Sequence, residues 1–125
     1  MDKSQAVFNF WNTFDLPVYD EQTVPTGSEK LPMPYLTYST VLDSEGNVVQ
    51  LNASLWYQST SWAAISKKAE EISKRITAGG TVIKIDGGYV WLCRGTPFAQ
   101  RMADTSDPDI RRIYINVQAE YLTAD

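Results

Sequence analysis

Residues 3–14 have the hydrophobic spacing of one helical face. Their large apolar side chains recur at i, i+3, i+4 and i+7: Val7, Phe10, Trp11 and Phe14. Asp2 or Ser4 can cap this helix, and it has to end before Pro17, because the residue before a proline avoids helical geometry. A short helix with so much apolar surface needs a larger element on which to dock.

The period then changes to two. Residues 35–42 and 48–58 alternate apolar and polar positions, and the turn formers of 43–47 separate them, so we expect an antiparallel hairpin. One face of the second strand is apolar: Val49, Leu51, Ala53, Leu55 and Tyr57. Trp56 falls on the other, polar face, where it is either covered by a helix of the same chain or marks an interface with another chain.

A second helix is predicted over residues 60–77. A narrow apolar stripe runs along it in steps of three and four: Trp62, Ile65, Ala69, Ile72 and Ile76. Ser59 or Ser61 supplies a capping oxygen, and Gly79-Gly80 supplies the positive φ that ends helices. We expect this stripe to pack across a sheet.

Three further strands are predicted over 81–85, 89–94 and 112–122. Asp86-Gly87-Gly88 between the first two is a strong hairpin signal. Residues 89–94 are apolar on both faces, which indicates a central strand or one covered by a neighbouring subunit. The long strand 112–122 is expected inside the sheet.

Two segments lack periodicity. Residues 20–34 are rich in proline and charge and are predicted to be a flexible loop, either a solvated connector or an arm that orders on a partner. Residues 95–111 are predicted to be a second loop, with a short helical turn over 98–102. The order of elements indicates one α+β domain over 1–125, with an antiparallel-rich mixed sheet and two helices packed on one face.

The chain of 125 residues contains no histidine and one cysteine, Cys93. This excludes Ser-His-Asp and Cys-His nucleophile systems, structural zinc sites and an internal disulfide. The acidic cluster Asp104, Asp107 and Asp109 lacks the glycine and the distal glutamate of a calcium loop. We therefore expect no catalytic residue, no metal and no cofactor. No window has the length of apolar residues that a membrane span needs, so no membrane partner is expected.

The formal charge is −4. This acidic balance argues against a protein whose main task is to grip nucleic acid through its phosphates. Four arginines flank the acidic loop: Arg94, Arg101, Arg111 and Arg112. Structural ion pairs and contacts to a neighbouring subunit are the favoured roles for these arginines, ahead of a nucleic-acid patch.

Over residues 5–122 the chain resembles the tail terminator (tail completion) proteins of long-tailed bacteriophages, including prophages of Gram-positive hosts. Three blocks carry the resemblance: Pro17-Val18-Tyr19 with Pro34-Tyr35-Leu36-Thr37-Tyr38; Ser54-Leu55-Trp56-Tyr57 with Trp62 and the helix to Arg75; and Asp86-Gly87-Gly88-Tyr89 with Gly95-Thr96-Pro97-Phe98-Ala99-Gln100-Arg101.

The resemblance implies a non-enzymatic virion protein, made in the host cytoplasm and located in the tail. It would assemble as a hexameric ring that caps the tail tube, stops its polymerisation and joins it to head–tail connector proteins, while DNA passes through the lumen without specific binding. Candidate interface residues lie in 20–34, 43–47 and 95–109 and on two strand faces: Val24, Lys30, Met33, Glu45, Trp56, Trp91, Phe98, Arg101 and Met102.

Two other functions stay open. One is another head–tail connector or minor tail subunit. The other, from a different class, is a small α+β ligand-binding or enzymatic module that uses carboxylates.

Overall fold

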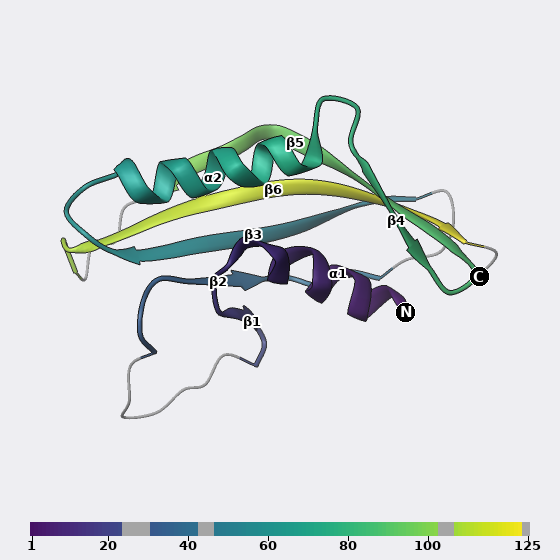
Figure 1. Cartoon of the computed structure of the whole chain (residues 1–125), viewed down its shortest axis with the longest axis horizontal. Helices are drawn as coiled ribbons and strands as arrows, with labels where there is room; N and C mark the ends of the chain where they lie inside the picture. The colour runs from purple at the N-terminus through teal and green to yellow at the C-terminus, as the bar shows by residue number, and fades with distance from the viewer. Residues whose placement is uncertain (24–30, 43–46, 103–106, 124–125) are drawn as a thin grey trace.

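A computed structural model describes residues 1–23, 31–42, 47–102 and 107–123. Figure 1 shows one long sheet and two helices, one above and one below its long strands in this view. The elements in chain order are α1 (Lys3–Trp11), η1 (Asn12–Phe14), β1 (Val18–Asp20), β2 (Tyr35–Tyr38), β3 (Val48–Gln58), α2 (Ala63–Ile76), β4 (Thr81–Ile85), β5 (Gly88–Met102) and β6 (Ile110–Thr123).

The six strands form one mixed sheet in the order β1-β2-β3-β6-β5-β4. β1 pairs with β2 in parallel, and the other four pairings are antiparallel. The last strand of the chain, β6, lies between β3 and β5, as its length and alternation predicted. The predicted α+β class, with its antiparallel-rich mixed sheet, is confirmed.

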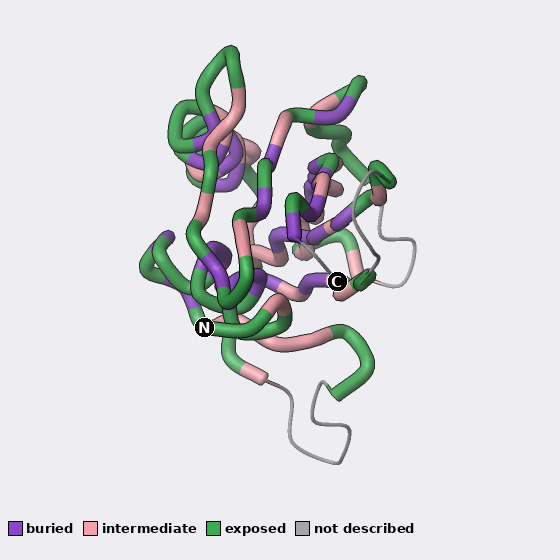
Figure 2. Tube along the Cα trace, turned by 90° about the vertical axis from the view of Figure 1, so that its right-hand side faces the viewer, coloured by how far each residue is buried: buried purple, intermediate pink, exposed green. Residues whose placement is uncertain are grey.

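Both helices pack on the same face of the sheet. Alternate residues of β6 point into this layer and are buried: Ile113, Ile115, Val117, Ala119 and Tyr121. Val7 and Trp11 of α1 and Ile65 and Ile72 of α2 meet them in one apolar core. Figure 2 marks the buried and exposed residues along the chain trace.

Local sequence explains where the helices begin and end. The Asp2 side chain accepts a hydrogen bond from Gln5 N at 2.8 Å, and Gln5 Oε1 accepts one from Asp2 N, which forms a capping box. Helix α2 begins at Ala63, whose N–H donates to Ser61 Oγ at 3.1 Å. Its end differs from the prediction, because the C-cap residue Thr77 (φ 69°) takes a positive φ three residues before Gly80 does.

The prediction of a loop over residues 95–111 is largely wrong. β5 continues through Met102 and β6 begins at Ile110, so residues 98–102 are strand and not a helical turn. The pairing of β5 with β6 shifts between Arg94 and Ala99. Asn116 Nδ2 donates to Pro97 O at 2.8 Å there, so the side chain of β6 replaces a ladder hydrogen bond at the irregularity. Gly95 and Pro97 are typical loop residues in the sequence, but here they lie in this bulge within a strand.

Smaller corrections concern the first half of the chain. Asp20, predicted as the start of the loop 20–34, is the last residue of β1, a strand of three residues. β2 ends at Tyr38, four residues before the end of the predicted strand 35–42, and Leu42 is 52% exposed. The central part of the predicted loop, 24–30, lies outside the described residues.

Candidate interaction surfaces

The face of the sheet opposite the helices, called here the open face, is polar in its centre and apolar at its ends. Side chains alternate along β3, so Gln50, Asn52, Ser54 and Trp56 point to this face while Leu51, Ala53 and Leu55 enter the core. Within the described part of the chain, neither helix packs against the open face.

Five exposed apolar side chains form a row across one end of the open face: Val48 (60% exposed), Val82 (57%), Tyr89 (47%), Trp91 (39%) and Leu122 (39%). We call them the apolar row. The register makes them neighbours on four strands, because Val82 lies opposite Trp91, Tyr89 opposite Leu122, and Val48 and Trp91 both opposite Glu120. An exposed row of this size is typical of a surface that meets a partner.

Trp91 is held in a fixed position within this row. Its Nε1 donates to Gly79 O at 3.1 Å, and a Cβ at Gly80 would lie 2.5 Å from the same nitrogen. Gly80, at φ 86°, therefore lets the loop after α2 pass close to the indole. Burial, and then the neighbouring Glu120 carboxylate, raise the pKa of the Cys93 thiol, which keeps this sulfur in its unreactive protonated form.

An aromatic ladder crosses the other end of the open face. The Tyr19 and Tyr35 rings meet edge-on with 5.8 Å between their centroids, and Tyr35 stacks on Trp56 with 6.2 Å between centroids. The Cζ atom of Arg112 lies 4.7 Å from the centroid of the Trp56 ring. Trp56 Nε1 donates to Thr37 Oγ1 at 3.0 Å. Trp56 is therefore half-buried by side chains of its own face, and the second helix lies on the other side of the sheet.

Polar contacts also fix the ladder. Arg112 Nε donates to Ser54 Oγ at 3.1 Å, which holds the guanidinium near the Trp56 and Tyr114 rings. Burial, and secondarily the nearby Tyr19 hydroxyl, raise the pKa of Tyr35. The ladder is thus a neutral aromatic surface with one planar cation in it.

A groove of about 300 Å³ lies on the helix side, between α2 and the second half of β5. We call it the α2–β5 groove. It is lined by Ser66, Ala69, Glu70, Ser73, Phe98, Ala99, Arg101 and Ile113. Arg101 lies over the Trp62 ring at 4.8 Å, and Arg94 Nη1 donates to Ser73 Oγ at 2.8 Å. Two arginines of β5 therefore stand at the rim of an apolar hollow.

The structure separates the predicted interface residues into several places. Val24, Lys30 and Glu45 lie outside the described residues. Met33 is half-buried before β2, and Met102, 36% exposed, lies opposite Arg112 at the end of β5. Trp56 and Trp91 lie at opposite ends of the open face, whereas Phe98 and Arg101 line the α2–β5 groove.

Sequence reasoning missed Val48, Val82 and Leu122 as surface residues. The available signal was the apolar character of both faces along 89–94, which indicated a second covered face without saying which side chains of the neighbouring strands it included.

Among the described residues, carboxylates and the cysteine thiol do not gather in one place. No set of three or more His, Cys, Asp or Glu side chains comes together among residues 1–23, 31–42, 47–102 and 107–123. No helix in these ranges is long and apolar enough to cross a membrane.

No protein-family model matches the chain, and no curated protein matches it in sequence. Among solved structures, the chain is similar to a chain in a structure described as the virion of a native gene transfer agent particle. The TM-score is 0.59 at 20% sequence identity, over 93% of this chain and 91% of that chain. At this identity the likeness shows that the two chains share a fold along nearly their whole length.

Proposed function

We propose that the chain is a structural, non-enzymatic subunit of a phage-like virion, and specifically a tail terminator. The observation that carries the proposal is the fold shared over 93% of the chain with a chain of a gene transfer agent virion. In this role six copies form a ring on the last ring of the tail tube, stop its growth and present a surface to the head connector.

The terminator role within such a particle is supported by the three sequence blocks that resemble tail terminators. All three include residues of the surfaces described above: Tyr19, Tyr35 and Trp56 are in the aromatic ladder, and Phe98 and Arg101 line the α2–β5 groove. A closed ring needs two different, complementary surfaces on each subunit. The apolar row, the ladder and the groove offer separate surfaces for the tube, the connector and neighbouring subunits.

DNA would pass through the lumen of this ring without specific binding. Ten acidic and ten basic side chains fall within the described residues, so the formal charge of −4 comes from the remaining positions. The aromatic ladder contains a single arginine, whose Nε already donates to Ser54 Oγ, so this surface offers little to a phosphate backbone.

A head–tail connector or another minor tail subunit is the second candidate. The description of the similar structure fits this candidate equally well, because that description refers to the whole particle and not to one component. A ligand-binding or enzymatic module that uses carboxylates is less favoured. Of the residues that line the α2–β5 groove, Glu70 alone carries a carboxylate, so the groove holds no carboxylate pair.

The test is to add the purified chain to polymerising tail tube protein encoded by the same genome. A terminator shortens the tubes and leaves a ring at one end of each tube in negative-stain images, while tube protein alone grows without limit. Overgrown, uncapped tubes with the chain bound only to purified connector would instead identify a connector subunit. Absence of binding to both components would contradict a role in the tail.

A further inference from the structure

We propose that the α2–β5 groove receives the β1 edge of a second copy of this chain, with Asp20 and Glu21 of one copy against Arg94 and Arg101 of the next. The inference rests on the ring of the proposed function and assigns the contact that closes it.

The sheet order places the two surfaces on opposite sides of the molecule. β1 is at one edge of the sheet, and β4 with β5 forms the other. β4 pairs with Gly88–Leu92, so within the described residues the second half of β5 has β6 on one side and a free edge on the other. A ring is built from a contact between two such different surfaces, repeated until it closes.

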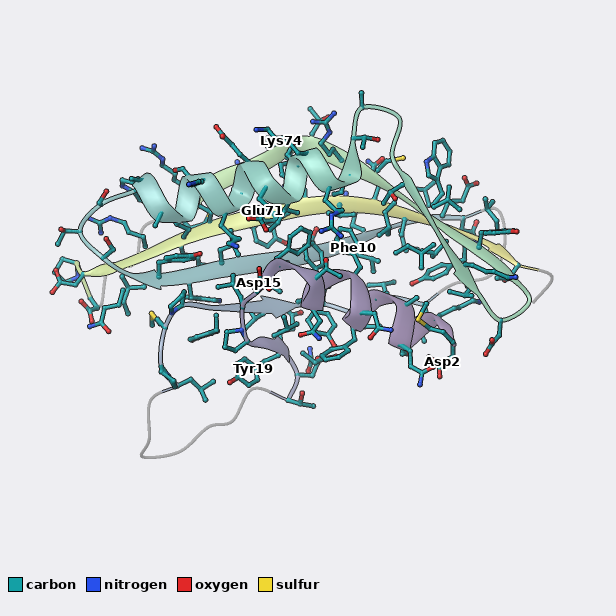
Figure 3. All side chains as sticks on the ribbon, in the orientation of Figure 1. Asp2, Phe10, Asp15, Tyr19, Glu71 and Lys74 are labelled. Atoms are coloured by element: carbon teal, nitrogen blue, oxygen red, sulfur yellow. The ribbon has the colours of Figure 1, made fainter. Side chains whose placement is uncertain are left out.

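The groove side of this contact is apolar in its floor and basic at its rim. Ala69, Phe98 and Ile113 line the floor. Exposed cations stand on β5 and on the adjoining turns of α2, with Glu70 as the acid among them: Arg94, Arg101, Lys67 and Lys74. Figure 3 shows Lys74 on the outer side of α2, far from Tyr19.

The β1 side is acidic. Asp20 ends the edge strand and its Oδ1 accepts a hydrogen bond from Gln22 N at 2.8 Å, which holds the carboxylate beside the strand. Glu21 is exposed. A short edge strand next to a free strand edge can extend a sheet from one subunit into the next. The acids at the end of β1 and the arginines at the groove, which carry opposite charges, fix the direction of docking.

A second copy fits both surfaces better than an unrelated partner does. The cations at the groove and the acids at β1 belong to one chain whose described residues carry balanced charge. An unrelated acidic protein would fill the groove and leave the β1 edge unpaired. Copies docked head to tail satisfy both surfaces of every subunit.

The test uses cysteine pairs. In a Cys93→Ser background, Glu21→Cys and Ala99→Cys place one thiol on each surface. The two strands are about 19 Å apart across the sheet, at ~4.8 Å for each of four strand spacings, so they cannot join within one chain. Oxidation of free protein and of protein on tube ends should give a ladder of multimers on a non-reducing gel. Lys84→Cys with Glu21→Cys is the control that should give none.

Charge reversal provides a second measurement. Arg101→Glu and Glu21→Arg should each raise, by roughly tenfold, the protein concentration below which rings dissociate. The two substitutions together should return this concentration to that of the unmodified chain. Arg101→Gln controls for loss of the Trp62 contact, Lys84→Glu is a charge reversal away from the contact, and thermal melting verifies that every variant folds.

The outcomes separate this inference from the proposed function. If the unmodified chain caps tubes as a ring but the cysteine-pair variant gives no ladder of multimers, the contact assigned here is wrong and the function stands. The same holds if the two reversed charges do not rescue each other. If the chain forms no oligomer, either free or on tubes, both are wrong. A ladder together with rescue supports the contact.

Discussion

Gly88 shows how a single position at the start of β5 is limited by the backbone of the next strand. A Cβ at this residue would collide with the carbonyl oxygen of Leu122 and lie 3.0 Å from Thr123 Cα. Both atoms belong to the central strand β6 and cannot yield like a flexible side chain. We expect Gly88→Ala to lower the free energy of unfolding by about 2 kcal/mol, measured by urea denaturation.

Gly79→Ala is the matched control for this substitution. A Cβ at Gly79 meets no atom within 4 Å, so its effect should stay within about 0.5 kcal/mol. Equal losses in the two variants would mean that crowding by β6 is not the cause.

Tyr121 should make the stability of the chain fall in alkali. Its ring is fully buried and its hydroxyl donates to Val41 O at 2.8 Å. Burial raises the pKa of Tyr121 above its ordinary value of 10.0. The unfolded chain loses this proton near pH 10 while the folded chain keeps it. The stability that Tyr121 contributes is therefore complete below pH 10 and declines as the pH rises through the pKa of Tyr121 in the folded chain.

Tyr121→Phe tests this pH dependence. At neutral pH the lost hydrogen bond should cost about 1 kcal/mol, and above pH 10 the decline in stability should become flatter. Urea denaturation between pH 8 and pH 11 gives both quantities. Tyr89→Phe, at an exposed ring of the apolar row, serves as the control and should leave the slope unchanged.

Among the elements, those with long amphipathic repeats were predicted well. Ile65, Ala69, Ile72 and Ile76 are all buried, because a stripe at helical spacing has one way to face a sheet. The β5 bulge escaped prediction, since Pro97 finds its hydrogen-bond partner in the side chain of Asn116, and no local pattern announces that contact. β1 was missed because three residues are too few to show a period.

The capping box of α1 gives a test at the scale of one element. Asp2→Ala removes the acceptor of the Gln5 N–H, and we expect the free energy of unfolding to fall by about 1 kcal/mol. Asp2→Asn keeps a capping oxygen and should retain most of the stability, as measured by thermal melting. If the asparagine variant loses as much stability as the alanine variant, the negative charge of Asp2 stabilises the helix and the capping hydrogen bond does not.

For the molecule as a whole, the candidate surfaces could be predicted only in part. Trp56 and Trp91 stood out as aromatics on exposed strand faces, and both lie on the open face. The α2–β5 groove could not be foreseen, because Phe98 and Arg101 were assigned to a loop, and Ser66 and Ser73 join them only through the packing of α2 on β5. Surfaces built from distant segments depend on strand order, which the sequence pattern leaves open.

The apolar row is the surface property of the whole molecule that can be measured most directly. The protein should bind the dye ANS while fully folded, because five apolar side chains on four adjacent strands are exposed together. Val82→Lys with Leu122→Lys should reduce this fluorescence at least about twofold and leave the melting temperature within about 2 °C, since exposed positions contribute little to folding. Gln50→Lys with Gln100→Lys places the same two charges on the open face outside the row and should leave the fluorescence unchanged. Loss of fluorescence in the control as well would show that the dye does not report on the row. A lower melting temperature only in the Val82→Lys, Leu122→Lys variant would show that the row packs within the chain.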